Sequence, residues 1–341
     1  MAKFSFSSLH IRIGQHLAFV FLAIFLPLLA SCTDDNLYLV YDDGKHLYIT
    51  EADDPNPVPL LPAIHGISPD ASPNGQSFSF ISDNTSGRLI GTWGIHSKIE
   101  WDKHPEFGAF IFDPTPINES SYLFSALKAN HMDIYSSGQK KNITSFRSMD
   151  FEPSVSPNGN LLAFTTNRIS NTDIYTNERP LSDRQSIEKV KEWDITERGI
   201  TYNTYRDHNI DIFISHIDGT NPVRLTSARA LDHQPEWSND GNWIAFSSLR
   251  HGNSEIFIIR NDGTNLKRLT NNQNNDEEPS WSPDGNLIAF ISDRSGSKNI
   301  YTMNPDGTNQ IRIKTTLSDL YSPTWIKCNP GILGKVGKTC P

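Results

Sequence analysis

Arginines recur at a fixed interval in the second half of the chain, and they are the side chains best placed to do chemistry. Arg206, Arg250 and Arg294 lie 44 residues apart, and Arg168 holds the same phase in an earlier copy. Polar residues in nearby connections keep the same interval, namely Asp232, His233, Asp276 and Glu277. A planar guanidinium binds a carboxylate through two parallel hydrogen bonds. The pattern therefore indicates ion pairing or recognition of a polar ligand.

Two interpretations of these eight residues remain open. The structural one is salt bridging between neighbouring repeats, and it is favoured because a repeated residue most often serves the repeat. The functional one is a polar surface that binds a peptide, a glycan or a partner protein. We keep all eight residues as candidate binding residues.

Catalytic motifs are absent from the sequence. It contains no Gly-x-Ser-x-Gly elbow, no His-Glu-x-x-His, no Cys-x-x-Cys and no Gly-x-x-x-x-Gly-Lys-Ser/Thr phosphate loop. His208, His233 and His251 fall in predicted loops, but they lack Cys or carboxylate partners at metal-ligand spacing. We therefore predict no catalytic residue, no metal and no cofactor. The alternative is a glycan- or peptide-processing lyase or hydrolase whose site is built from loops.

The elements that position these side chains repeat with the same period. Trp237, Trp281 and Trp325 are 44 residues apart, and each follows a proline by two positions. An Asp-Gly-Thr turn begins at Asp218 and returns at the same interval. Self-similarity in this range means stacked supersecondary units, and strand-type units indicate a β-propeller.

One full copy, residues 279–315, contains four short strands joined by three hairpin loops, which is one propeller blade. The predicted fold is all-β, with seven four-stranded blades; six remain possible because residues 85–115 are irregular. Inner strands are expected to begin near residues 69, 112, 153, 194, 235, 279 and 322. Residues 37–60 supply only three strands, so the strand at 322–326 should complete that blade and close the ring. Trp237 and Trp281 should be buried at equivalent sites.

The loops of such blades divide between two rims. Loops between the second and third strands, together with loops between blades, carry the arginines, and we call this side the arginine rim. The opposite side carries the Ser-Pro-Asp-Gly and Asp-Gly-Thr turns, and we call it the turn rim. Function usually resides on longer loops, which favours the arginine rim as a binding surface.

The repeat Pro-x-Trp-Ser-Pro-Asp-Gly…Ile-Ala-Phe-x-Ser-Asp-Arg…Asp-Gly-Thr resembles the TolB-like, WD-related propeller family. It is nearly intact at 235–270 and 279–315, recognisable at 153–175 and 200–226, and degenerate at 69–135. The resemblance implies a propeller, and the family serves many roles. The repeats begin close to the N-terminal apolar segment, so we expect the chain to lack the separate α/β domain of TolB proteins.

The N-terminus has the pattern of an export signal. Lys3 and Arg12 precede an apolar run at 17–30, and Leu-Ala-Ser-Cys at 29–32 resembles a bacterial lipobox. We predict a signal peptide at 1–31, lipidation of Cys32, a tether at 32–36, the propeller at 37–327 and a tail at 328–341. An ordinary cleaved signal or an uncleaved anchor are the alternatives.

Location follows from this N-terminus. We predict that a lipid attaches the protein to the cell envelope. Thr33 after the lipidated cysteine resembles diderm sorting signals for the outer membrane, on the side facing the periplasm.

The three cysteines also fit export. If Cys32 is acylated, Cys328 and Cys340 remain as a pair. A disulfide between them would hold the tail beside the closing strand. Two free or metal-binding thiols are the alternative.

Charge limits the partners. Removal of residues 1–31 takes two basic groups away and changes the formal net charge from −9 to −11. Nucleic acid and anionic lipid surfaces would be repelled. We therefore predict a membrane-anchored binding or scaffold propeller whose partner is an envelope protein, a peptide or a glycan; the sequence does not indicate an oligomeric state.

Overall fold

The computed structural model describes residues 37–51, 58–59, 65–72, 75–84, 87–93, 99–102, 104, 107, 110–118, 121–137, 141–144, 148–156, 162–167, 173–176, 179–180, 193–196, 199–206, 209–216, 220–313, 315, 317 and 319–327. The predicted signal segment, the tether with Cys32 and the tail with Cys328 and Cys340 lie outside the described residues.

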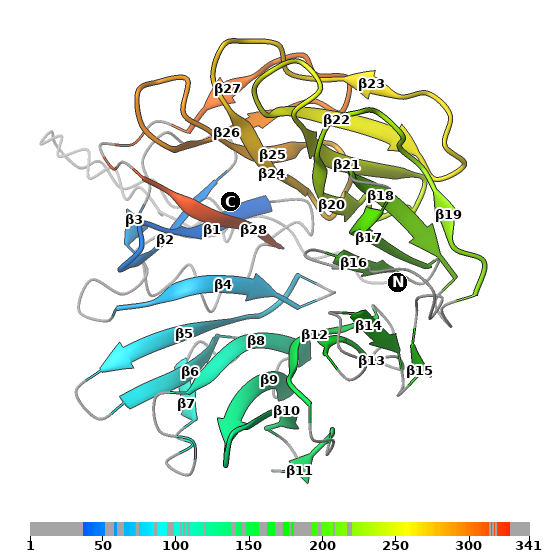
Figure 1. The fold of residues 1–341 in the computed structure, drawn as a ribbon. Helices are drawn as coiled ribbons and strands as arrows, with labels where there is room; N and C mark the ends of the chain where they lie inside the picture. Colours follow the sequence, from blue (N-terminus) through cyan, green and yellow to red (C-terminus); the bar gives the residue numbers. More distant parts are fainter. Residues whose placement is uncertain are drawn as a thin grey trace, which may run out of the picture. The chain divides into compact units, whose positions relative to one another are not determined.

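The described residues form seven antiparallel sheets of four strands, arranged in sequence order around a common centre (Figure 1). From the centre outward, blade 1 consists of β28 (Tyr321–Lys327), β1 (Leu37–Asp42), β2 (Leu47–Glu51) and β3 (Val58–Pro59), and blade 2 of β4 (Ile67–Ala71), β5 (Phe78–Asn84), β6 (Gly87–Trp93) and β7 (Ile99–Asp102). Blade 3 consists of β8 (Ile111–Asn118), β9 (Ser121–Lys128), β10 (His131–Ser136) and β11 (Lys141–Asn142). Blade 4 consists of β12 (Asp150–Val155), β13 (Leu162–Thr166), β14 (Asp173–Thr176) and β15 (Arg179–Pro180).

Blade 5 consists of β16 (Trp193–Thr196), β17 (Gly199–Arg206), β18 (Asn209–Ser215) and β19 (Val223–Arg224). Blade 6 consists of β20 (Asp232–Trp237), β21 (Trp243–Ser248), β22 (Glu255–Arg260) and β23 (Lys267–Arg268). Blade 7 consists of β24 (Asp276–Trp281), β25 (Ile288–Ser292), β26 (Asn299–Met303) and β27 (Ile311–Arg312). The first strand of each blade contacts the first strand of the next, all the way round. The expected seven blades and the expected starts of the inner strands are confirmed.

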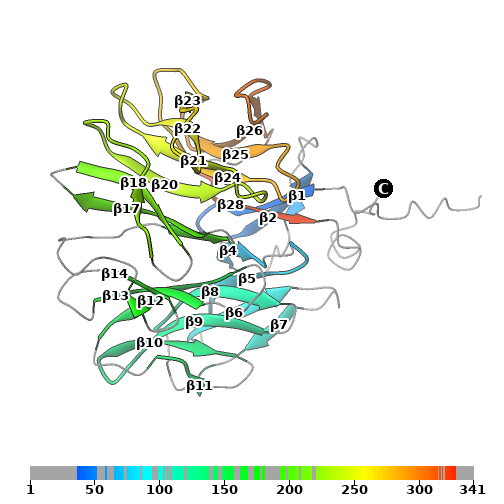
Figure 2. The ribbon, with the colours of Figure 1, turned by 90° about the vertical axis from the view of Figure 1, so that its right-hand side faces the viewer.

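The ring is closed by the two ends of the propeller sequence, as predicted. β28 pairs antiparallel with β1, with Leu37 opposite Lys327 and Leu39 opposite Trp325. Figure 2 shows these two strands side by side. This pairing satisfies backbone groups that an open first blade would expose.

Packing between blades explains the repeated aromatics. Trp237, Trp281 and Trp325 are only 5%, 7% and 3% exposed, which confirms their predicted burial at equivalent sites. Trp281 belongs to a hydrophobic cluster with side chains of β22 and β25, and this cluster joins blades 6 and 7. The aromatic pairs separated by 11 residues stack across neighbouring strands, as Phe246 does on Phe257. The repeat thus supplies one layer of the hydrophobic core per blade.

Inner strands carry a β-bulge at a fixed position. In blades 6 and 7 the bulge residues Gln234 and Glu278 have φ near +53°, although neither is a glycine. The strand register shifts at these points. Such a bulge re-aims the following side chains, and bulges are common where a sheet builds a site.

None of the described residues forms a helix that is long and apolar enough to cross a membrane.

Candidate functional site

Seven polar side chains, one from each blade, line the central channel at one level. They are Asp70, Thr115, Ser154, Asp194, Glu236, Ser280 and Thr324, and we call them the polar ring. Each occupies the same repeat position, and in six blades it directly follows a proline. The position lies beyond the bulge, near the end of the inner strand that approaches the turn rim. The ring therefore presents three carboxyl groups and four hydroxyl groups to the channel.

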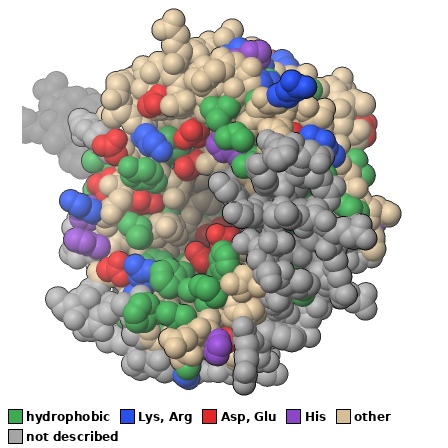
Figure 3. Space-filling view, in the orientation of Figure 1, with side chains coloured by type: hydrophobic (Ala, Val, Ile, Leu, Met, Phe, Trp, Pro, Cys, Tyr) green, Lys and Arg blue, Asp and Glu red, His purple; other side chains and the backbone are tan. Residues whose placement is uncertain are grey.

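These side chains line a cavity of about 440 Å³. Gly75, Asn239 and Pro283, which belong to the turns of the turn rim, line it as well. Its lining residues include no Lys, Arg or His. Figure 3 views the molecule from the opposite, arginine-rim face, where the surface is also hollowed at the middle of the ring. The cavity is therefore acidic and lies at the turn-rim end of the channel.

Hydrogen bonds between neighbouring inner strands hold the ring residues in place. Asp194 Oδ2 accepts the backbone N–H of Trp237 at 2.7 Å, and Glu236 Oε1 accepts that of Trp281 at 2.7 Å. The hydroxyl of Thr115 donates to the carbonyl of Pro153 in the next blade at 2.7 Å. One oxygen of Asp194 and one of Glu236 thus serve the frame, and in both cases the partner is a backbone group that fixes the orientation of the side chain.

Confinement in the channel changes the acidity of the ring. Asp70 and Glu236 are partly accessible, yet protein surrounds them. Burial raises the pKa of Asp70 to about 7, and the charge of Asp194 adds to the shift. Burial, and then the charge of Asp194, raise the pKa of Glu236 well above its usual value. The carboxyls of Asp70 and Glu236 therefore take up protons more readily than carboxyls in water.

Two indole N–H groups at the cavity wall have no hydrogen-bond partner. Trp237 and Trp281 both line the cavity, and their Nε1 atoms are buried without an acceptor. The equivalent Trp325 donates its Nε1–H to the carbonyl of Ser280 at 3.0 Å. Blades 6 and 7 therefore each keep an unused donor beside the acidic ring. Among the described residues, no group of three or more His, Cys, Asp or Glu is placed to hold a metal ion.

The arginine rim is built differently, because its arginines are bound to acids of their own blade. Arg250 donates to both carboxylate oxygens of Asp232 at 2.9 and 3.0 Å, and Arg294 donates to Asp276 at 2.6 Å. Asp232 and Asp276 are fully buried, and the arginine side chains are only 14% and 20% exposed. Each guanidinium also lies over aromatic rings of its blade, Arg250 over Phe257 at 4.5 Å.

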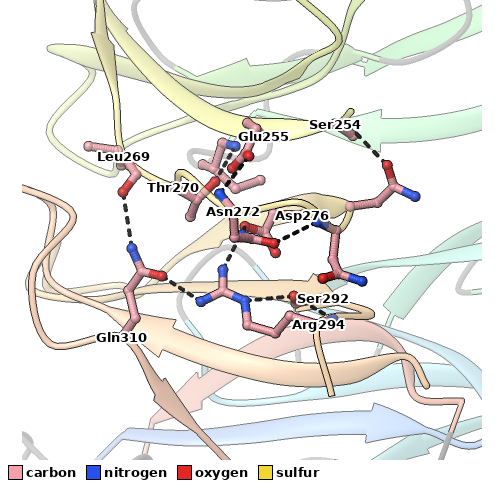
Figure 4. A network of polar contacts seen from close by, with 12 residues as sticks. Ser254, Glu255, Leu269, Thr270, Asn272, Asp276, Ser292, Arg294 and Gln310 are labelled. Atoms are coloured by element: carbon pink, nitrogen blue, oxygen red, sulfur yellow. Dashed lines mark hydrogen bonds and ion pairs between the residues drawn. The ribbon is translucent and has the colours of Figure 1, made fainter. Parts of the chain in front are cut away.

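Figure 4 shows how the contacts of Arg294 continue into the neighbouring blade. Its guanidinium donates to Gln310, whose amide donates to the carbonyl of Leu269 in blade 6 at 3.0 Å. Asn272 donates its side-chain amide to Asp276 and its backbone N–H to Glu255 of blade 6. This geometry supports the structural interpretation of the repeated arginines, with the difference that each arginine pairs within its own blade and amide side chains make the link between blades.

The remaining predicted residues of this rim differ in placement. His233 and Glu277 are partly exposed at the start of β20 and β24, and Glu277 lies 4.0 Å from Lys298. The backbone of Arg206 ends β17, but its side chain lies outside the described part of the chain, as does all of Arg168. Of the eight candidates, the structure brings Asp232 to Arg250 and Asp276 to Arg294, and these two clusters belong to separate blades.

Sequence reasoning missed the polar ring. The signal was present, because the residue between Pro and Trp of the repeat varies among Glu236, Ser280 and Thr324 while its neighbours do not vary. A position that varies inside an otherwise strict repeat is typically not part of the hydrophobic core. Without the bulge geometry, however, nothing in the sequence says that this position faces the channel.

The comparisons agree with this architecture. Residues 176–332 match the family model for the TolB beta propeller domain. A putative TolB from Agrobacterium tumefaciens is similar in structure at 17% identity, with a TM-score of 0.52 and coverage of 86% of this chain and 98% of that one. TolB from Acinetobacter baumannii is similar at 17% identity and a TM-score of 0.55, with coverage of 86% of this chain and 67% of that one.

Other propellers are similar as well. A structure from a study of two prolyl endopeptidases matches at 11% identity and a TM-score of 0.61, covering 85% of this chain and 49% of that one. A comparison with curated proteins finds none that matches. Likeness at these identities shows the fold alone. Taken with the seven closed blades, the comparisons show a β-propeller fold, and residues 176–332 are similar to the TolB beta propeller domain.

Proposed function

We propose that the protein is a lipid-anchored binding propeller of the cell envelope, and that it takes a segment of its partner into the channel cavity. The observation that carries this proposal is the polar ring, in which every blade contributes one side chain to a single cavity of about 440 Å³. A cavity lined by a few convergent polar groups and by residues of perturbed pKa is the usual form of a binding site.

The chemistry of the cavity favours a ligand with a basic group. Three carboxyls converge where the lining residues include no basic side chain, and the mature chain carries a formal charge of −11. A lysine or arginine side chain or an amino terminus would pair with the carboxylates of the ring.

The lipid anchor is part of the proposal. Cys32 in its lipobox-like context, followed directly by the propeller, gives an exported body held at the membrane. A cysteine carrying two or more acyl chains anchors stably, whereas a single chain does not.

A second candidate surface is the arginine rim. Phe110, Met149 and Leu231 are 54%, 42% and 41% exposed, and each directly precedes the inner strand of its blade. Exposed apolar side chains around polar loops are typical of protein contacts. This surface would bind a folded partner rather than an inserted segment.

Affinity capture from envelope extract tests whether the partner binds in the channel cavity or at the arginine rim. The double variant Asp70→Asn with Glu236→Gln removes charge but keeps an acceptor oxygen for the N–H of Trp281, so it should fold. We expect it to lose the partner that the wild-type protein retains. The matched control is Phe110→Ser with Leu231→Ser, which should still capture that partner. Loss with the control and retention by the ring variant would place binding at the arginine rim instead.

A further inference from the structure

The chain enters the propeller at the same rim that holds the cavity. Leu37, the first residue of β1, pairs with Lys327, the last residue of β28. The backbone N–H of Lys327 donates to the carbonyl of Gly75 at 2.9 Å, and Gly75 lines the cavity. The attachment point of the N-terminal tether is therefore at the turn rim, on the second strand from the channel.

The length of the tether limits the orientation of the propeller on a membrane. Four residues, 33–36, separate the predicted lipidated cysteine from β1, and the five Cα–Cα steps from Cys32 to Leu37 span at most about 18 Å when extended. To turn the arginine rim to the bilayer, the tether would have to pass the two outer strands of blade 1, at about 5 Å each, and then run about 20 Å along the blade. That path is longer than the tether.

Negative charge on the turn rim helps to keep this rim at a distance from the surface of the bilayer. Exposed Asp262 and Asp306 accept hydrogen bonds from the hydroxyl and backbone N–H of Thr264 and Thr308, which lower the pKa of both carboxyls. These groups stay ionised and are repelled by anionic headgroups, although the neighbouring charges of Arg260 and Lys267 reduce the repulsion. Screening limits the repulsion to about 8 Å at physiological salt, which is less than the reach of the tether. The rim can therefore stand off from the bilayer and leave the channel open.

We propose that the turn rim faces the bilayer and that the channel cavity receives its ligand from the membrane side, so that the ligand is a membrane-proximal segment of a partner. This inference rests on the lipid anchor and the cavity of the proposed function. It assigns the opposite, arginine rim to contacts with partners farther from the membrane.

Fluorescence quenching on vesicles tests the orientation. Leu266 and Gln273 are exposed on opposite sides of β23, Leu266 at the turn rim and Gln273 at the arginine rim. In a background with Cys328→Ser and Cys340→Ser, each is changed to cysteine and labelled. The lipidated full chain is then reconstituted in phosphatidylethanolamine–phosphatidylglycerol vesicles that carry a quencher on the headgroup. We expect the label at position 266 to be quenched at least twofold more than the label at 273.

Equal quenching at the two positions, or stronger quenching at 273, would overturn the orientation while leaving the anchor in place. Failure of the full chain to float with the vesicles would instead refute the anchor itself. A variant with about 30 Gly/Ser residues between Asn36 and Leu37 has a mean reach of about 30 Å and should lose the difference. If the difference persisted, the rim itself would adhere to lipid, and the tether would not set the orientation.

Discussion

At the scale of single residues, the arginine rim shows why repeated charge does not by itself indicate a ligand site. The guanidinium of Arg294 is 20% exposed and faces the fully buried carboxylate of Asp276. The neighbouring pair of Lys298 and Glu277 is 39% and 30% exposed, with its charges 4.0 Å apart. Only the first pair leaves a buried charge behind when one partner is removed.

This contrast gives a stability prediction. Arg294→Ala should lower the free energy of unfolding by about 3 kcal/mol, because Asp276 would stay buried without its cation. Lys298→Ala should cost less than about 1 kcal/mol. Urea unfolding of both variants checks the difference. If both variants lost equally little free energy of unfolding and folded Arg294→Ala failed to capture the partner, Arg294 would be a binding residue instead.

The polar ring predicts how stability depends on pH. The folded-state pKa of Asp70 is about 7, and that of Glu236 is also raised, whereas unfolded carboxyls titrate near pH 4. The folded protein therefore holds more protons between about pH 4 and 7, and this contribution to stability is lost as the pH rises through that window.

Asp70→Asn with Glu236→Gln should remove this loss. We expect the variant to match the wild-type protein at pH 4.5 and to exceed it at pH 8 by on the order of 1 kcal/mol, after allowance for solvent in the channel. Urea titrations at pH 4.5, 6 and 8 measure the difference. A difference that does not change with pH would show that the ring carboxyls titrate normally.

What the sequence predicts at this scale depends on the type of interaction. The repeat indicates that its arginines pair with acids, but it predicted pairs between neighbouring blades, whereas Arg250 and Asp232 belong to one blade. The convergence of Asp70, Asp194 and Glu236 could not be predicted, since it depends on which face of a bulged strand turns to the channel.

At the scale of elements, the repeat determines nearly the whole architecture. Strict copies such as β20 to β23 and β24 to β27 carry turn residues and aromatics at fixed positions, and these specify hairpins and packing locally. Blades 2 and 3 fold in the same way although their repeat is degenerate. In those blades the pairing is supported by neighbours on both sides, which a sequence pattern does not reveal.

Ring closure gives a prediction for β28. Trp325 packs against Leu39, Tyr41 and Ile291, and so joins blade 1 to blade 7. Trp325→Ala should lower the free energy of unfolding by about 3–5 kcal/mol. Trp243→Ala, at a partly buried site of β21, should cost clearly less. Equal losses in thermal and urea unfolding would show that the closing strand has no special share in stability.

At the scale of the whole molecule, the proposed tether and the channel would act together. A lipid at Cys32 would confine the propeller to a membrane surface, and a cavity at the rim next to the tether would sample only what lies close to that surface. Confinement of this kind raises the effective concentration of a membrane-proximal partner without any new contact.

The anchor itself can be tested in cells. Cys32→Ser should release the protein from membranes or leave an uncleaved precursor, because acylation of the thiol precedes anchoring. Fractionation and mass spectrometry of the N-terminal peptide measure both outcomes. Cys328→Ser serves as the control and should remain in the membrane fraction. An unlipidated N-terminus in the wild-type protein would contradict the assignment.

Site-specific photocrosslinking in the envelope tests the central claim, which is that a partner segment enters the channel cavity. A photoreactive amino acid is placed at Asn239, an exposed residue that lines the cavity, and, in a second protein, at Gln273 on the opposite rim. We predict a discrete crosslinked partner from position 239 that disappears when Asp70→Asn and Glu236→Gln are added, and no such product from position 273. A partner captured from position 273 alone, or one from position 239 that is indifferent to the ring substitutions, would contradict it.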